Sequence, residues 1–171
     1  MSEQTRKTVL ITGASSGIGE AFAQVFLEAG FNLVITARRM NRLEDLKVKL
    51  LKNSDARIDL ISMDLSKLEA PKYIHQYCVD NEIHIDALVN NAGYGNTGKF
   101  EEMEWERHQN FLQVMVNTIV ELTYLFLPSM VNNGYGRIIN LASLAPFIPS
   151  PDMAGLYSPV KIFQIKFSES I

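Results

Sequence analysis

The sequence predicts one α/β domain, residues 1–171, built on a doubly wound parallel sheet with the strand order 3-2-1-4-5. Three observations support this fold class. Short apolar segments alternate with amphipathic helical patterns along the chain, which is typical of parallel strands joined by right-handed crossovers. A glycine-rich turn joins the first apolar segment to the first helix. The composition is 47% apolar, which is enough for a sizeable core, and no linker or internal repeat divides the chain.

The expected strands are short apolar runs at residues 7–12, 32–36, 57–62, 85–90 and 136–142. Nearly continuous apolar runs are typical of strands that are covered on both faces. The expected helices cover residues 17–29, 41–52, 68–81, 104–133 and 155–171. Gly30 is expected to end the first helix, Asn41 to cap the second, and Pro71 to lie in the first turn of the third.

The fourth expected helix is long and strongly apolar. Between residues 111 and 130 its apolar positions occupy more than one face, which predicts burial against the sheet and against another helix, either of this chain or of a second subunit. Pro128 is expected to bend or interrupt it. A proline-rich loop at residues 146–151 then leads to the last helix.

Composition and charge argue against several functional classes. The net charge is −3 without a basic stripe, so we expect no nucleic-acid partner. Polar residues interrupt the apolar runs before membrane-spanning length, and the N-terminus is polar, so we expect no membrane partner and a cytoplasmic location. Cys78 has no cysteine partner and is expected to be a buried structural thiol. No metal site is expected, because the histidines lack ligand spacing: His75, His84 and His108.

The turn at residues 12–19 is the first candidate binding element. It follows a strand and opens a helix, so backbone N–H groups and the helix dipole would meet a pyrophosphate there. The Gly-x3-Gly-x-Gly spacing differs from the common dinucleotide fingerprint. The alternative is a helix N-terminus with flexible serines. The candidate cofactor-binding residues here are Gly13, Ser15, Ser16, Gly17, Ile18 and Gly19.

The loops after the second and third strands would lie on the same rim, outside the carboxyl ends of the strands. Arg38 and Arg39 follow the second strand, with no acidic residue between Gly30 and Leu43, which favours NADP(H) over NAD(H). The alternative is a pair of solvated arginines.

After the third strand, Asp64 could accept a hydrogen bond from an adenine amino group while the Leu65 N–H serves the ring. Alternatively, Asp64 or Ser66 caps the following helix.

The loops after the fourth and fifth strands complete the rim. Asn90, Asn91, Ala92 and Gly93 end the fourth strand, where the amides could brace neighbouring strands and the small residues leave room for a cofactor. Ser143 follows the fifth strand.

Tyr157 and Lys161 stand four residues apart, so on a helix they share one face. A lysine cation there would lower the pKa of the phenol, and Ser143 could hydrogen-bond a substrate oxygen. The loop residues Tyr94, Leu144, Phe147 and Met153 favour an apolar substrate pocket.

Taken in register, these motifs resemble the short-chain dehydrogenase/reductase (SDR) family over the whole chain. The resemblance implies a Rossmann-like fold and hydride transfer between NADP(H) and an alcohol or carbonyl substrate. It implies that Tyr157 is the proton donor or base, that Lys161 lowers its pKa and holds the nicotinamide ribose, and that Ser143 polarises the carbonyl. Tyr157 and Lys161 are both expected to bind the cofactor as well. Asn117 would anchor a water in the proton relay. It also implies a homodimer or homotetramer formed through the long and last helices, whose apolar faces are equally explained as surfaces that cover the sheet.

Two features depart from the family pattern. Pro159 lies between Tyr157 and Lys161, so either the helix starts near Gly155, or Ser158 is its N-cap and Tyr157 lies outside.

The chain also ends at Ile171, where family members continue with further strands and a helical substrate lid. The expected fold therefore lacks the family's last strands and leaves the fifth strand as a long apolar edge. Truncation, incomplete recording and a naturally short product would each explain this end. The alternative function is an NADP-binding domain without catalytic activity.

Overall fold

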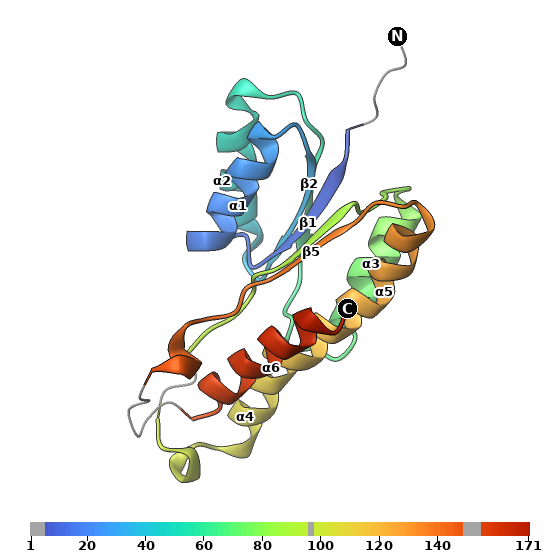
Figure 1. Ribbon diagram of the computed structural model, residues 1–171. Helices are drawn as coiled ribbons and strands as arrows, with labels where there is room; N and C mark the ends of the chain where they lie inside the picture. Colours follow the sequence, from blue (N-terminus) through green and yellow to red (C-terminus); the bar gives the residue numbers. More distant parts are fainter. Residues whose placement is uncertain (1–5, 96–97, 149–154) are drawn as a thin grey trace.

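The computed structural model describes residues 6–95, 98–148 and 155–171, which form three layers around a parallel sheet (Figure 1). The sheet has five strands in the order β3-β2-β1-β4-β5, and every neighbouring pair is parallel. The predicted fold class and strand order are therefore confirmed. The strands are β1 (Thr8–Thr12), β2 (Asn32–Ala37), β3 (Ile58–Ser62), β4 (Ala87–Asn90) and β5 (Arg137–Asn140).

Helices cover both faces of the sheet (Figure 1). One face carries α1 (Gly17–Glu28) and α2 (Met40–Leu50). The other carries α3 (Ala70–Asp80), α4 (Trp105–Leu112), α5 (Thr118–Asn132) and α6 (Tyr157–Glu169). Short 3-10 turns occur at Leu51–Asn53, Phe100–Glu102 and Ala145–Phe147.

The two faces of β1 show how the core is divided. Val9 and Ile11 pack with α1 and α2, whereas Leu10 packs with α3 and α5, because successive side chains of a strand point to opposite faces. All three side chains are fully buried. Each contributes about 1.5–3 kcal/mol of burial free energy, so the central strand is held from both sides.

The helix signals in the sequence are partly confirmed. Pro71 lies in the first turn of α3, and Cys78 is buried in the same helix, as predicted. Asn41 does not cap α2, because the helix already begins at Met40 and Arg39 is its N-cap residue. The Leu43 N–H bonds to the Arg39 carbonyl, which places Asn41 inside the first turn.

The long apolar helix is interrupted in a different place from the one predicted. Pro128 lies inside α5, which continues through it to Asn132. The irregularity is a π-helical segment at Gln113–Asn117, between α4 and α5. Such π segments insert a wider turn into a helix and are frequent at functional sites.

By length and composition, Trp105–Asn132 could cross a membrane, with a mean hydropathy of 1.5. This corrects the expectation that polar residues interrupt every apolar run before membrane-spanning length. Part of this helix is packed inside the protein, since 44% of the apolar window is buried. Phe111, Met115, Leu122 and Phe126 are buried in the core cluster on the α3 side of the sheet. A buried core helix passes the same test, so length and composition alone do not make this segment a membrane span.

The start of α6 settles the alternatives raised by Pro159. The helix begins at Tyr157, and its first bond of α-helical spacing runs from the Val160 N–H to the Leu156 carbonyl. Pro159 therefore stands in the first turn, where its missing N–H removes no helical bond. Tyr157 lies inside the helix, and Ser158 is not its N-cap.

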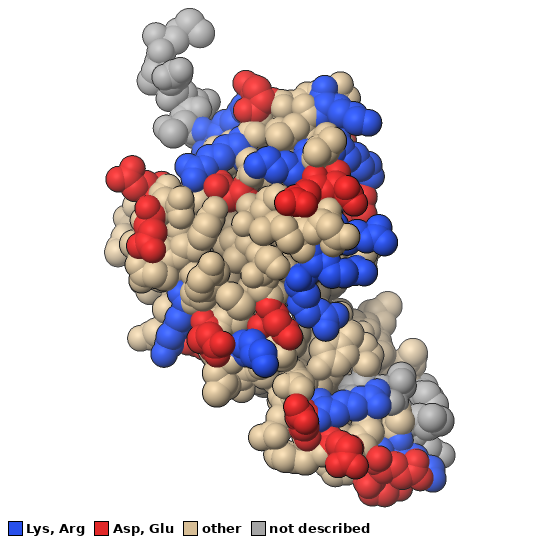
Figure 2. Space-filling model, turned by 180° about the vertical axis from the view of Figure 1, so that it is seen from behind, with Lys and Arg blue, Asp and Glu red and all other residues tan. Residues whose placement is uncertain are grey.

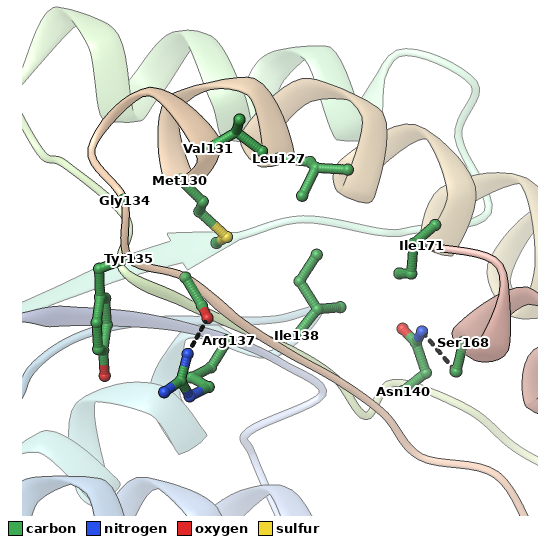
Figure 3. A pocket seen from close by; sticks show the side chains of 11 residues that line it. Leu127, Met130, Val131, Gly134, Tyr135, Arg137, Ile138, Asn140, Ser168 and Ile171 are labelled. Carbon is green, nitrogen blue, oxygen red and sulfur yellow. Dashed lines mark hydrogen bonds between the residues drawn. The ribbon is translucent and has the colours of Figure 1, made fainter.

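The outer edge of β5 is shorter than predicted, because the strand covers only Arg137–Asn140. A hollow of about 370 Å³ lies beside it, between the end of α5 and the end of α6 (Figure 3). Polar contacts interrupt this edge. The Asn140 amide donates to the Ser168 hydroxyl at 2.9 Å, and Arg137 bonds the Gly136 carbonyl at 2.7 Å (Figure 3). Polar groups of this kind interrupt an apolar strand edge.

Charged side chains of both signs intermix over the face shown in Figure 2. Several form exposed pairs, such as Lys49 with Glu20 and Lys99 with Glu102, both at 2.7 Å. Exposed pairs of this kind contribute little to stability.

Candidate active site

A cleft of about 990 Å³ opens at the carboxyl ends of the strands, on both sides of the point where the strand order reverses. Most of the predicted site residues line it: Gly13, Ser15, Ser16, Ile18, Arg38, Arg39, Asp64, Leu65, Asn91, Ala92, Gly93, Ser143, Tyr157 and Lys161. Four do not. Gly17 and Gly19 start α1, Asn90 is buried beneath the rim, and Asn117 ends the π segment.

The glycine-rich turn packs closely against the end of β4. Gly13 has a φ of +67°, and a Cβ there would lie 2.7 Å from the Ala92 Cα. A Cβ on Gly19 would collide with the Gly13 carbonyl oxygen. Gly17 is different, because its φ is +59° but a Cβ would meet nothing within 4 Å. Close packing therefore requires glycine at positions 13 and 19, whereas Gly17 faces open space.

The N-terminus of α1 meets the cleft through Ser16. This residue is extended and makes no side-chain capping bond. The first N–H groups of α1 therefore lack the partner that a capping serine would provide, and an anion in the cleft could take that place.

Thr12 joins the glycine-rich turn to the loop after β4. Its hydroxyl donates to the Val89 carbonyl at 3.3 Å and accepts from the backbone N–H groups of Asn91 and Ala92, both at 3.0 Å. In return, the Asn91 amide donates to the carbonyls of Thr12 at 2.9 Å and Gly13 at 3.2 Å. The predicted bracing role of Asn91 is confirmed.

Asn90 braces the strand on the other side. Its amide donates to the Asn140 side-chain oxygen at 2.8 Å, which links β4 to β5. Asn90 is buried, with 2% of its surface exposed. It therefore supports the cleft from beneath and is not part of its wall.

Arg38, Asp64 and Tyr94 bring charge and aromatic surface to the β2–β3 side of the cleft. Burial opposes ionisation of Asp64, but the Ser66 N–H and hydroxyl, with the charges of Arg38 and Lys67, hold the pKa of the carboxyl below its ordinary value. Burial raises the pKa of the Tyr94 phenol, while Arg38 opposes that shift. The charge of Arg38 therefore acts to lower the pKa of two groups inside the cleft, Asp64 and Tyr94.

Neither Asp64 nor Ser66 caps α3, which corrects that alternative. The N-cap residue of α3 is Glu69, and the helix starts at Ala70. Asp64 instead closes the turn after β3, where its carboxylate accepts from the Ser66 N–H at 3.0 Å. This bond fixes the carboxylate at the cleft wall.

Ser143, Tyr157 and Lys161 line the opposite side of the cleft. The Ser143 hydroxyl accepts from the Ala145 N–H at 3.1 Å, which fixes the turn after β5. Tyr157 and Lys161 share one face of α6, and the Lys161 ammonium lies 5.7 Å from the centre of the Tyr157 ring.

The Lys161 ammonium is held by two oxygen atoms. It donates to the Leu141 carbonyl at 2.6 Å and to the Gln164 side-chain oxygen at 2.9 Å. Only 6% of Lys161 is exposed, and burial lowers the pKa of its ammonium to about 8. A cationic group with a pKa so close to neutrality can respond to a nearby proton transfer.

The π segment contributes residues that the motifs did not indicate. The Asn117 amide donates to the Gln113 side-chain oxygen at 2.9 Å, within the segment itself. The Met115 carbonyl accepts from the buried Gln164 amide at 2.8 Å. The one available signal for Gln164 was a glutamine in an apolar helix, three residues after Lys161.

The residues expected to form an apolar substrate pocket lie only partly at the cleft. Leu144 and Phe147 are 79% and 66% exposed beside the cleft, and Met153 lies outside the described residues. Within residues 6–95, 98–148 and 155–171, no three histidine, cysteine, aspartate or glutamate side chains gather as metal ligands would.

With this geometry in place, the chain can be compared with known proteins. A family model described as short chain dehydrogenase matches residues 7–171. The chain belongs to the short chain dehydrogenase family. The 11-beta-hydroxysteroid dehydrogenase of Pinus massoniana is 34% identical over 166 residues, which are 96% of this chain and 46% of that relative. The chain thus spans about half the length of such SDR relatives.

Solved SDR structures share the fold. The L-sorbose reductase of Gluconobacter frateurii, complexed with NADPH and L-sorbose, superposes with a TM-score of 0.89 and 30% identity, over 96% of this chain and 62% of that one. A bulky-bulky ketone specific alcohol dehydrogenase from Comamonas testosteroni has a TM-score of 0.88 and 30% identity, over 96% and 65% of the two chains. The described strands and helices are therefore those of an SDR fold.

Proposed function

We propose that this SDR chain is the cofactor and catalytic part of an NADP(H)-dependent oxidoreductase acting on alcohol or carbonyl substrates. The observation that carries the proposal is that one cleft is lined by the glycine-rich turn, Arg38 and the group of Ser143, Tyr157 and Lys161. Phosphate binding and proton transfer would thus take place within one site. In this proposal the chain forms a single dinucleotide-binding domain.

The residues present fit NADP(H). Gly17 faces open space, and the start of α1 has no side-chain cap, which suits a pyrophosphate. Arg38 and Arg39 would bind the 2′-phosphate as charge-assisted donors. Asp64 and the Leu65 N–H would bind the adenine, and Asn91, Ala92 and Gly93 would bound the cofactor along the β4 rim. The cofactor would supply the hydride, while the protein orients the substrate and moves the proton.

Tyr157 would donate its phenolic proton to the substrate oxygen in carbonyl reduction, and accept it in alcohol oxidation. The nearby Lys161 cation would favour the phenolate and hold the nicotinamide ribose. The Ser143 hydroxyl would hydrogen-bond the carbonyl oxygen and stabilise charge that develops on it. Asn117 would anchor a water that resupplies the proton.

The relatives support the substrate class. The names of the similar proteins include a hydroxysteroid dehydrogenase, an L-sorbose reductase and a ketone-specific alcohol dehydrogenase. All three names describe chemistry at an alcohol or carbonyl group. Similar structures that contain NADPH include the L-sorbose reductase and a short-chain dehydrogenase from Sphingobium yanoikuyae. We propose the same cofactor here, in a cytoplasmic protein with no membrane or nucleic-acid partner.

We also propose that the protein is a homodimer or homotetramer. The exposed surfaces of the long and last helices carry large apolar side chains. Tyr124 and Val131 are 74% and 67% exposed, and Phe163 stacks on Phe167 with ring centres 5.9 Å apart. Exposed apolar side chains that lie together are typical of protein interfaces. Sedimentation velocity would test it, and a monomer at micromolar concentration would contradict it.

The alternative is an NADP(H)-binding protein without catalysis. The exposure of Leu144 and Phe147 beside Ser143 favours it, because a substrate there would be only partly enclosed. Two measurements separate the functions. Enhanced NADPH fluorescence on mixing tests cofactor binding, and NADPH consumption with a panel of ketones and aldehydes tests catalysis. Binding without consumption supports the alternative, and the absence of binding contradicts both.

A further inference from the structure

Gln164 is a buried amide on the second turn of α6. It is 1% exposed, and both ends of its side chain are used. The oxygen accepts from the Lys161 ammonium at 2.9 Å, and the nitrogen donates to the Met115 carbonyl at 2.8 Å. This orientation is the one that satisfies both partners, because an ammonium can only donate and a carbonyl can only accept.

Packing alone does not explain a glutamine at this position. Burying an amide costs free energy unless both of its ends are hydrogen-bonded, and methionine would fill a similar volume without that cost. The neighbouring inward residue, Val160, belongs to the apolar core. What the amide adds is a fixed oxygen beside Lys161 and a fixed link to the π segment.

We propose that Gln164 is a positioning residue that holds the Lys161 ammonium at the cleft wall and ties it to the π segment that carries Asn117. Gln164 does not line the cleft itself, so it acts through Lys161. The importance of that lysine for the reaction rests on the proposed function. The link between Gln164 and Lys161 does not.

The geometry leaves one N–H group of the Lys161 ammonium for a bound molecule. An ammonium has three N–H groups, and within the described residues the Leu141 carbonyl and the Gln164 oxygen take two. Both acceptors come from within the fold, and Lys161 lines the cleft. The third N–H can therefore serve a group bound there, such as a ribose hydroxyl.

The electrostatic surroundings make Gln164 important for the charge state of Lys161. Within the described residues, the titratable side chain beside Lys161 is the Tyr157 phenol, on the same helix. The groups by which the end of β5 and the π segment bond to α6 are neutral: the Leu141 carbonyl accepts from Lys161, and the Met115 carbonyl accepts from Gln164. Gln113 and Asn117 of the π segment are neutral amides that bond each other. Burial lowers the pKa of Lys161 to about 8, and an oxygen at 2.9 Å favours the charged form against that trend.

The test is a pH titration of Lys161 in the full chain, followed by NMR of lysine labelled with ¹³C at Cε. The Lys161→Met variant assigns the signal. Gln164→Met removes the acceptor, so the midpoint should fall by about one pH unit. Gln164→Glu places a carboxylate there, so the midpoint should rise. Ser168→Ala is the matched control, because it removes the bonds of Ser168 to the Gln164 backbone carbonyl and to the Asn140 amide without touching the ammonium. Its midpoint should stay unchanged.

A structural role alone would not move the two midpoints in opposite directions. Equal midpoints in the wild type and both Gln164 variants would overturn the proposal, as would shifts of the same sign. If Gln164→Met does not fold, Gln164→Glu decides the matter, and a midpoint that does not rise refutes the link.

A parallel NADPH titration separates this inference from the proposed function. If the wild type binds no NADPH, the proposed function fails while the NMR result still decides the role of Gln164. If it binds, Gln164→Met should weaken binding several-fold more at about pH 8 than at about pH 6, because its Lys161 is then largely neutral. Equal weakening at both values contradicts the positioning role.

Discussion

On the glycine-rich side of the cleft, the ends of neighbouring strands hold one another. Asn91 donates from its backbone N–H and from its side-chain amide to Thr12, which joins the loop after β4 to β1, and Gly13 fits directly against Ala92. On the Tyr157 side, the key group is held from further away. Lys161 depends on a carbonyl after β5 and on Gln164, which itself depends on the π segment.

This difference predicts different consequences of mutation. On the glycine-rich side, close packing restricts which residues fit, so substitutions should affect folding and cofactor binding together. On the Tyr157 side, the charge state of Lys161 depends on its surroundings, so substitutions should affect proton transfer and its pH dependence while the fold survives. The four predictions below test that division.

The largest expected effect is on turnover. Tyr157→Phe removes the proton donor while keeping the ring, so turnover should fall by about a hundredfold or more. NADPH affinity should change much less than turnover, because the other residues that would bind the cofactor along the cleft are left intact. Steady-state rates and fluorescence titrations of the two proteins check this, and an active Phe variant excludes the mechanism.

Gly13→Ala should destabilise the fold strongly. The positive φ costs about 1–2 kcal/mol, and the contact with Ala92 adds about 1–3 kcal/mol of overpacking. Gly17→Ala is the matched control, since Gly17 also has a positive φ but open space where a Cβ would lie. This substitution should cost only about 1–2 kcal/mol. Urea unfolding of both variants measures the difference, and equal losses would show that close packing at Gly13 is unimportant.

Arg38→Asp should shift the cofactor preference from NADPH toward NADH by about tenfold to a hundredfold, because it removes a donor to the 2′-phosphate and adds a repulsive charge. Arg42→Asp makes the same charge change on α2, away from the cleft lining, and should leave the preference nearly unchanged. The ratio of the two dissociation constants is the measurement. An unchanged ratio in Arg38→Asp rejects the assignment of this residue.

The remaining effect is on the pH dependence of stability. Burial lowers the pKa of Lys161 from its ordinary 10.5 to about 8, so between these values the unfolded chain binds more protons at this site than the folded protein. The free energy of unfolding should therefore rise with pH across this window. Denaturant unfolding of the wild type and Lys161→Met gives the difference, which should grow from about pH 8 to about pH 10.5. Parallel profiles would contradict the burial argument.

Most of the fold followed from local signals in the sequence. The strands are apolar runs, and the glycine-rich turn is marked by the small residues that its tight packing requires. The positions of Asn90 and Asn91 follow from the end of β4. These features were therefore predicted correctly. Asn41 was misassigned because α2 begins directly after β2, and backbone geometry overrode a favourable capping side chain.

The features that could not be predicted depend on contacts between distant elements. The π segment has no proline or glycine to mark it, whereas Pro128, which looked disruptive, fits inside α5. Gln164 is recognisable only when α6 is placed against Met115, 49 residues away in the chain. The site residues themselves were indicated by the joint pattern of motifs, and their roles stay proposals.

The most direct test of the account follows the hydride itself. The chain is incubated with NADPH deuterated at both C4 positions and a ketone from the active part of the panel, and the alcohol is examined by mass spectrometry. We predict an alcohol one mass unit heavier than that formed with ordinary NADPH, and no such product with Tyr157→Phe. An unlabelled alcohol, or no alcohol from any carbonyl compound while NADPH binds, would contradict hydride transfer in this cleft.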